Sequence, residues 1–276
     1  MLQDLLTSIP GRTVAAFILA LLISLLAYRA SALAPSGAVA ATIVGTLIVS
    51  GGGWWAGLAL VVFFVTSSAL SLWRKRRRRA EQRRGSRRDA VQVLANGGPA
   101  ALLAIIAGIS SSPLWVVALI ASLAAANADT WATEIGGASG TIPRLITTLK
   151  PAPPGTSGAI SPAGTLAAIA GALLISLVGG LGALTGTFPG DLAALPLIAI
   201  VAVSGFFGCL ADSLLGATVQ ALYRCPSCNV LTEHPVHTCG ETAVLIKGHR
   251  WIDNDVVNVT AVTFGALLGL VLIWLT

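Results

Sequence analysis

Charge is the first thing that this sequence lacks. Only 10% of its 276 residues are charged, whereas an average globular chain carries roughly 25%. The deficit is sharper than the total suggests, because residues 74–89 alone hold 12 of the 28 charged side chains. The rest of the chain cannot cover a water-facing surface. This composition excludes an ordinary soluble enzyme, a disordered tail and a disulfide-stapled secreted module.

Alternating apolar and polar residues are also missing, which excludes an outer-membrane barrel. Long unbroken apolar runs are present instead, and a membrane-spanning helix needs about 20 such residues. The sequence therefore predicts an all-α, polytopic helical membrane protein forming a single integral membrane domain over residues 1–276. The eight expected spans are 13–29, 36–51, 54–73, 92–110, 113–133, 163–185, 192–221 and 255–275.

The first span has an alternative interpretation as a cleavable signal peptide, because small residues follow an apolar run near position 34. Asp4 and the scarcity of positive charge before the run argue against it. Cytoplasmic loops of membrane proteins retain Lys and Arg, so the basic loop 74–89 sets the orientation. Strict alternation of eight spans then places 16 of the 17 basic residues in the cytoplasm, with only Arg12 outside. Both termini are expected on the outer side.

The basic loop contains no aromatic side chain, and nucleic-acid binding would need aromatic or base-reading residues among the charges. We therefore expect a topology signal that contacts anionic membrane lipids, and no nucleic-acid partner.

Polar residues inside spans are costly and mark functional positions. The fifth and seventh spans each contain Ala-Asp followed by a hydroxyl residue, at Asp129 and Asp212. At 1.5 Å per residue these carboxylates lie about 22 Å and about 29 Å from the outer ends of their helices. Asn96 of the fourth span and residues 253–258 at the start of the eighth reach the same layer, which is expected to face the cytoplasm. The alternative role for these side chains is hydrogen-bonded helix packing.

The cytoplasmic loop 136–162 is rich in Gly, Pro and Ser and carries two lone cations, Arg144 and Lys150. A flexible linker would explain the glycines but not the cations beside an acidic helix end. Glycines allow close backbone approach, and hydroxyl and N–H groups bind phosphate oxygens. Carboxylates beside such a loop suit a magnesium-bound nucleotide.

A second cytoplasmic loop, 222–252, contains Cys225-Pro226-Ser227-Cys228 followed by His237 and Cys239. A reducing compartment disfavours a disulfide, and four such ligands suit a closed tetrahedral zinc site. His234 is an alternative fourth ligand. Cys209 lies within a span and is expected to serve packing.

Six motifs carry a family resemblance. They are Ala95-Asn96-Gly97, residues 127–136, residues 143–147, Gly155-Thr156-Ser157-Gly158, Ala211-Asp212-Ser213 with its continuation to Gln220, and residues 253–258. Together they resemble the transmembrane protein 19 family, formerly a domain-of-unknown-function family, which includes the phytyl-phosphate kinase of vitamin E synthesis. The Cys/His loop is not a general feature of that family, which favours a structural role for a zinc ion there. A shorter stretch, Asp129 to Gly136 with the Gly-Thr-Ser-Gly turn, is similar to CTP-using polyprenol kinases and CDP-diacylglycerol synthases.

The resemblance implies a membrane-embedded isoprenyl-phosphate kinase that uses Mg²⁺ and a nucleoside triphosphate, CTP or another, as donor. The expected magnesium or catalytic residues are Asp129, Glu134, Asp212 and Asp255. The expected phosphate-binding residues are Asn96, Arg144, Lys150, Thr156 and Ser157, with Asp253 and Asn258 as weaker candidates. The rival function is a transporter or lipid flippase that uses the same polar layer. It would need access from the outer side, where the outer halves of the spans carry no carboxylate.

Overall fold

The computed structural model describes residues 9–77, 87–188 and 192–276, so residues 78–86 of the expected basic loop lie outside it. Within this part, seven helices are long and apolar enough to cross a membrane. They are α2 (Ile9–Arg29), α3 (Pro35–Arg77), α4 (Ala90–Ser110), α5 (Pro113–Gly136), α6 (Pro162–Leu184), α7 (Ala194–Thr218) and α8 (Asn254–Trp274). The all-α membrane architecture expected from the sequence is confirmed.

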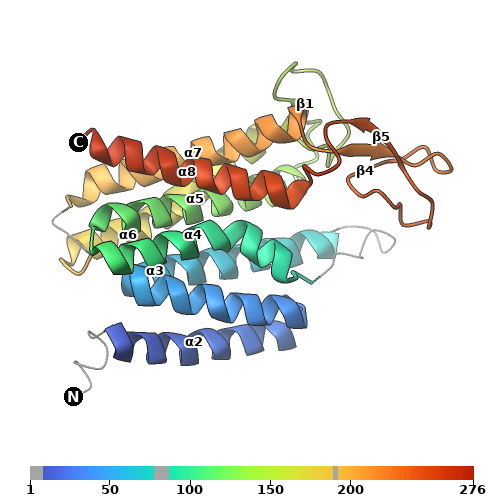
Figure 1. The fold of residues 1–276 in the computed structure, drawn as a ribbon. Coiled ribbons are helices and arrows are strands. Elements are labelled where there is room, and N and C mark those ends of the chain that lie inside the picture. The colour runs from blue at the N-terminus through green and yellow to red at the C-terminus, as the bar shows by residue number, and fades with distance from the viewer. Residues whose placement is uncertain (1–8, 78–86, 189–191) are drawn as a thin grey trace.

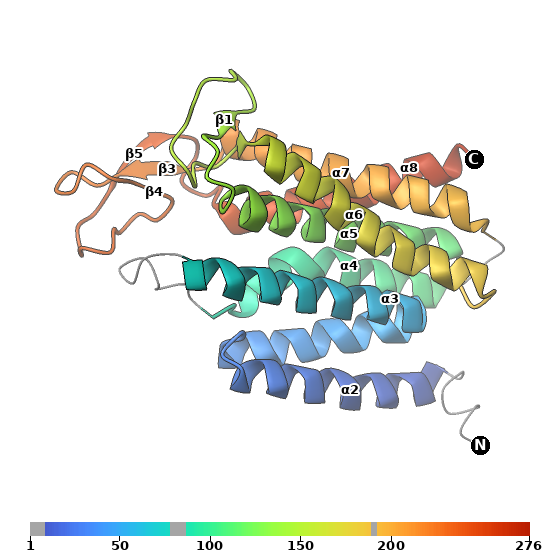
Figure 2. The same cartoon turned by 180° about the vertical axis from the view of Figure 1, so that it is seen from behind.

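Helix α3 accounts for the difference between seven helices and eight expected spans. It is 43 residues long, and Gly53 interrupts it with φ 83° and ψ −178°, a conformation open to glycine. The two arms fold back on each other. Their contact is shown by Gly57, where a side chain would overlap Val49, and by Gly45, where a side chain would approach Leu60. Figures 1 and 2 show both arms within the bundle. The two arms correspond to the expected spans 36–51 and 54–73.

The helices leave two different ends on the bundle (Figure 1). The connections 137–161 and 219–253, with all five short strands, lie at one end, which we call the loop end. The start of α2 and the end of α8 lie at the other. Arg12, expected on the outer side, lies at that other end, where its guanidinium donates to the carbonyl oxygen of Ser50 at 2.5 Å. Helices α4, α6 and α8 begin at the loop end with side-chain caps from Asp89, Ser161 and Asp253.

In the part of the chain that the structure describes, five short strands form two small sheets in the connections. β1 (Arg144–Leu145) pairs antiparallel with β2 (Ala159–Ile160), which closes the glycine-rich connection into a loop. β3 (Leu222–Arg224) lies between β4 (Leu231–Thr232) and β5 (Val244–Lys247), and both neighbours are antiparallel to it. The expected Cys/His loop is therefore a small folded module with a three-stranded sheet.

Helix α5 is the centre of the bundle, because every residue from Val116 to Ala128 is buried. It packs against α3, α4, α6, α7 and α8. Glycines on α7 make the closest approach: Gly205 lies against Ala124, and Gly208 lies against Ala125. Small residues at helix interfaces allow backbones to pack closely in membranes.

One prediction tests this packing. A Cβ atom at Gly208 would lie 2.5 Å from the Cβ of Ala125 and 3.2 Å from the carbonyl oxygen of Ala261. We expect Gly208→Ala to lower the free energy of unfolding by about 1–3 kcal/mol, measured by thermal unfolding in detergent. Gly98→Ala is the matched control, because its Cβ would meet only Leu94 at 3.9 Å and alanine favours the helix. Equal melting temperatures for the two variants would contradict a tight α5–α7 contact.

Candidate functional site

A polar cavity of about 510 Å³ opens at the loop end. Its walls come from the last turns of α5, the second half of α7, the first turns of α6 and α8, the glycine-rich connection, and single residues of α3, α4 and the Cys/His module. Seven of the residues predicted from the sequence line it together: Asn96, Asp129, Glu134, Thr156, Ser157, Asp212 and Asn258. The converging layer predicted from helix depth is thus a single cavity.

Asp129 of α5 and Asp212 of α7 form the acidic centre of this cavity. Both carboxyl groups line the same cavity and are close enough to interact electrostatically. The Oδ2 atom of Asp212 is buried and has no hydrogen-bond partner among the described residues. Leaving a buried carboxylate oxygen without a partner is unfavourable. A cation with a preference for oxygen ligands would satisfy both carboxylates, so this pair fits a magnesium ion.

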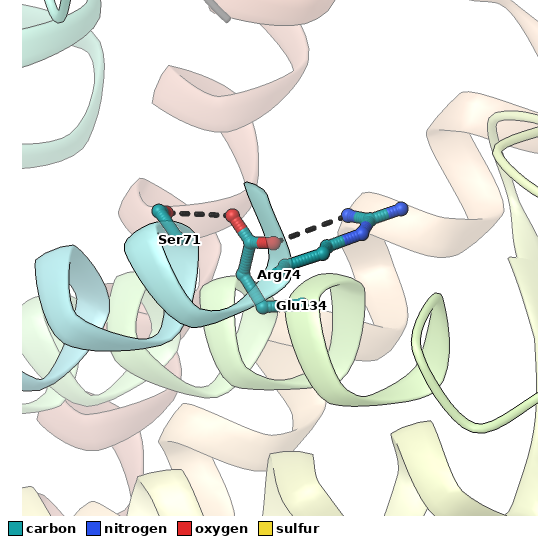
Figure 3. Close-up of polar contacts among 3 residues, drawn as sticks. All are labelled: Ser71, Arg74 and Glu134. Atoms are coloured by element: carbon teal, nitrogen blue, oxygen red, sulfur yellow. Dashed lines mark hydrogen bonds and ion pairs between the residues drawn. The ribbon is translucent and has the colours of Figure 1, made fainter. Parts of the chain in front are cut away.

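Glu134 also lies on α5, but its carboxylate is bonded to two residues of α3, Ser71 and Arg74 (Figure 3). Its Oε1 accepts a hydrogen bond from Ser71 at 2.6 Å, and its Oε2 lies 3.2 Å from Nη1 of Arg74. The two charged side chains are only 17% and 13% exposed, so the ion pair is largely shielded from solvent. Glu134 therefore ties the end of α3 to the end of α5 at the edge of the cavity.

The glycine-rich turn 155–158 covers the cavity from the α7 side. A side chain at Gly158 would overlap the backbone of Ala217, and a Cβ at Gly216 would lie 2.5 Å from the Ser157 hydroxyl. Gly155 and Gly158 both have positive φ, 87° and 78°. The turn can therefore rest directly on α7 because Gly158 and Gly216 lack side chains.

The hydroxyl groups of this turn are already used as donors. Ser157 Oγ donates to Oε1 of the buried Gln220 at 2.5 Å, and Thr156 Oγ1 donates to the carbonyl oxygen of Pro153 at 2.7 Å. Both residues line the cavity, but their hydroxyl protons stabilise the path of the loop. Contacts to a ligand would then come mainly from the glycine-rich backbone.

Four predicted residues do not line the cavity. Arg144 and Lys150 are exposed, and the Arg144 guanidinium donates to the carbonyl oxygen of Leu149 at 2.8 Å, which closes its own turn. Asp253 caps α8 by accepting from the N–H of Val256. Asp255 lies in the first turn of α8, whereas its neighbours Asn254 and Asn258 face the cavity.

The Cys/His module brings together Cys225, Cys228, His237 and Cys239, whose ligand atoms all lie within 4.8 Å of one another. Cys225 Sγ is 3.6 Å and His237 Nδ1 is 3.0 Å from Cys239 Sγ. This is the ligand set predicted from the spacing, and the structure selects His237, not His234, for it. Three thiols and an imidazole suit a closed tetrahedral metal site.

The same module is attached to the cavity. Lys247 Nζ donates to the carbonyl oxygens of Gly216 and Ala217, at 2.8 and 3.1 Å, and so caps the end of α7. Glu233, directly after β4, lines the cavity. Burial raises the pKa of the Glu233 carboxyl.

Arg74, Glu233 and Ser213 line the cavity but were not predicted as site residues. Arg74 was attributed to the topology signal because it begins a run of six basic residues. Glu233 is a single carboxylate within the Cys/His loop, and no sequence pattern predicts that it lies in the same cavity as Asp212. Ser213 is the hydroxyl residue of the repeat Ala-Asp-hydroxyl in the seventh span, and this repeat is the sequence signal that points to it.

Asn127 serves helix packing, which is the alternative role that the sequence leaves open for the polar residues inside the spans. It is fully buried, donates to the carbonyl oxygen of Gly171 at 2.7 Å and accepts from Thr66 at 3.2 Å. This network joins α5 to α6 and α3. Cys209, expected to serve packing, is buried and contributes to the cavity wall.

Comparison with known proteins places the chain in a family. Residues 18–266 match the family described as Integral membrane protein DUF92. Protein PGR of Arabidopsis thaliana is 36% identical over 201 residues, which is 67% of this chain and 68% of that protein. Uncharacterized membrane protein MJ0933 of Methanocaldococcus jannaschii is 40% identical over 134 residues, or 48% of this chain and 52% of that protein.

Protein VTE6, chloroplastic, of Arabidopsis thaliana is 28% identical over 187 residues, which cover 67% of this chain and 46% of that protein. The chain thus spans about half the length of two of these relatives and about two thirds of the third. No solved structure matches it. Because the family match covers most of the sequence, the chain belongs to the DUF92 family of integral membrane proteins, as the resemblance of its motifs indicated.

Proposed function

We propose that this protein is a membrane-embedded kinase that transfers a phosphoryl group from a nucleoside triphosphate to an isoprenyl monophosphate. The observation that carries the proposal is the facing pair Asp129 and Asp212, with an unpartnered buried oxygen, beneath a glycine-rich turn. The relationship to Protein VTE6 and the resemblance to phytyl-phosphate kinases support the same reaction class.

In this reaction an oxygen of the acceptor phosphate attacks the γ-phosphorus of the donor. The bond between that phosphorus and the bridging oxygen breaks, which yields an isoprenyl diphosphate and a nucleoside diphosphate. The acceptor is already ionised, so the protein needs to supply position and charge neutralisation and little proton transfer. A magnesium ion bound by Asp129 and Asp212 would neutralise the phosphates of the donor.

The chain's own residues would position the donor. The turn 155–158 presents backbone close to the acidic pair because Gly158 and Gly216 let it rest on α7. The Arg74–Glu134 ion pair holds the opposite wall, and Asn96 and Asn258 supply amide groups. Arg144, Lys150, Asp253 and Asp255 lie outside the cavity lining, so they have no role in this proposal.

Substitutions of the acidic pair test the proposed function. Asp129→Asn and Asp212→Asn keep size but remove the charge that would hold magnesium, so each should slow phosphoryl transfer by roughly a thousandfold or more. If the two residues served helix packing alone, each substitution would lower the stability of the protein by only about 0.6 kcal/mol, because asparagine still forms hydrogen bonds. Activity would then be largely retained. The measurement is transfer of labelled phosphate from a panel of nucleotides to phytyl, geranylgeranyl and farnesyl monophosphates.

Asp89→Asn is the matched control for these variants. Asp89 caps α4 outside the cavity lining, and asparagine is an equally good cap. Near-normal turnover in both Asp129→Asn and Asp212→Asn would refute the site. Substrate-dependent ion flux or lipid movement in liposomes, without phosphoryl transfer, would favour the rival transporter or flippase.

We also propose a structural zinc ion in the Cys/His module. The purified protein should contain about one zinc ion per chain, measured by elemental analysis, and Cys225→Ser with Cys228→Ser should remove it. Cys209→Ser is the control that should keep it, because Cys209 is not part of the ligand cluster. Because Lys247 and Glu233 connect the module to the cavity, loss of zinc should also lower transfer activity. Unchanged zinc content in the double variant would contradict the site.

We propose further that the loop end faces the cytoplasm, with both termini outside. A cysteine at Gly85, in the basic loop, should react with a membrane-impermeant maleimide only after the cells are permeabilised. Thr185→Cys, at the exposed end of α6 opposite the loop end, should react in intact cells, and the unaltered chain gives the background labelling. The reverse pattern would invert the orientation.

A further inference from the structure

A second cavity lies beside the polar one, between α2, the two arms of α3 and α4. Its volume is about 450 Å³, about three times that of an engineered apolar cavity of roughly 150 Å³ that holds one benzene molecule. It follows α2 from Ala16 to Ala27, a length of roughly 17 Å along the helix. Its lining is almost entirely aliphatic and aromatic.

Most polar side chains in the lining of this apolar cavity lie toward the loop end. They are Arg88, Gln92, Asn96, Thr130 and, on α2, Ser24. The indole of Trp54, beside the kink at Gly53, is the exception at the other end. Asn96 and Thr130 line the polar cavity as well. The two cavities therefore meet at these two side chains, and Thr130 is adjacent in the chain to Asp129.

Arg88 is the one basic residue in the lining of the apolar cavity. Backbone hydrogen bonds to Ala32 and Ala34 fix its position, and its Nη1 donates to Ser68 at 3.3 Å. Its guanidinium lies 6.0 Å from the centre of the Phe64 ring. Among the described residues it forms no ion pair, whereas Arg74 has Glu134. Glu134 is close enough to act on Arg88 electrostatically, but its carboxylate already pairs with Arg74, so a bound anion would further stabilise this partly buried cation.

We propose that the apolar cavity holds the isoprenyl chain of the acceptor, with its monophosphate on Arg88 and directed past Asn96 and Thr130 toward Asp129. This inference rests on the proposed kinase function and assigns its acceptor site. A guanidinium binds phosphate through two parallel hydrogen bonds. Arg88 would thus neutralise the acceptor while leaving an oxygen to face the donor in the neighbouring cavity.

Binding without catalysis tests the anion site. Purified protein is labelled with a photoreactive phytyl monophosphate in the absence of nucleotide, so that no phosphoryl transfer is needed. Arg88→Gln should reduce labelling by at least about tenfold, because a charge-assisted contact is lost, and Arg88→Lys should restore part of it. Arg87→Gln is the matched control, since Arg87 is exposed and its guanidinium donates to the Ser31 hydroxyl at the surface, outside the cavity lining.

Chain length tests the apolar site. Ala20 lines the cavity on α2, so Ala20→Phe should shorten it and weaken labelling by a phytyl probe at least about tenfold more than labelling by a geranyl probe. Leu22→Phe is the control on the same helix, because Leu22 is 54% exposed and outside the cavity lining. A probe built on phytol, without phosphate, should bind weakly to the unaltered chain.

The outcomes separate this inference from the proposed function. Labelling that depends on Arg88 and Ala20, with no phosphoryl transfer from any nucleotide, would retain the lipid-phosphate site and refute the kinase. Phosphoryl transfer with unchanged labelling in Arg88→Gln and Ala20→Phe would overturn the acceptor site alone. Equal labelling by phytol and phytyl monophosphate, insensitive to Arg88→Gln, would identify the cavity as a space for bilayer lipid and also overturn it.

Discussion

Close backbone contact around α5 is the constraint on which the rest of the structure depends. In a bilayer, helices gain little from burying apolar surface, so they associate through packing of small residues and a few hydrogen bonds. Here Gly205 and Gly208 of α7 lie against Ala124 and Ala125 of α5. Asp129 and Asp212 lie four residues further along each helix, so the same contact brings their carboxyl groups together. An acidic pair with an unpartnered oxygen is then a direct consequence of glycine and alanine placement.

The end of α7 connects the glycine-rich turn with the Cys/His module. Gly216 lets the turn 155–158 rest on the helix, and the carbonyl oxygens of Gly216 and Ala217 accept from Lys247 of the Cys/His module. Orphan carbonyl groups at a helix end need such donors. A metal ion bound in the module would fix β5 and its residue Lys247. Lys247 would in turn hold the end of α7, on which the turn 155–158 rests. This connection is the physical link by which a change in the Cys/His module would reach the cavity.

Helix depth was sufficient to predict that Asn96, Asp129, Asp212 and Asn258 share one layer, because a rise of 1.5 Å per residue places side chains along the membrane normal. Ligand spacing was likewise sufficient for the Cys/His cluster. Depth says nothing about rotation or partners, so the Arg74–Glu134 pair could not be predicted. It depends on how the second arm of α3 returns from Gly53. The positions of Glu233 and Arg144 depend on the path of loops, and loops have no periodic pattern from which a position could be predicted. Arg144 is close in sequence to the glycine-rich turn, but its side chain does not line the cavity.

In the proposed reaction between two anions, one of which carries a lipid chain, the two cavities would divide the requirements between them. A long apolar chain cannot enter a cavity lined by carboxylates and amides without losing its favourable transfer from water. Highly charged phosphates cannot enter a cavity lined by aliphatic side chains without losing hydration. Separate cavities that meet at Asn96 and Thr130 satisfy both conditions. The two phosphates would repel each other, so a shielded cation is needed on the acceptor side as well as a metal on the donor side. Arg88, whose backbone is bonded to Ala32 and Ala34 in the turn between α2 and α3, is the group that the fold provides there.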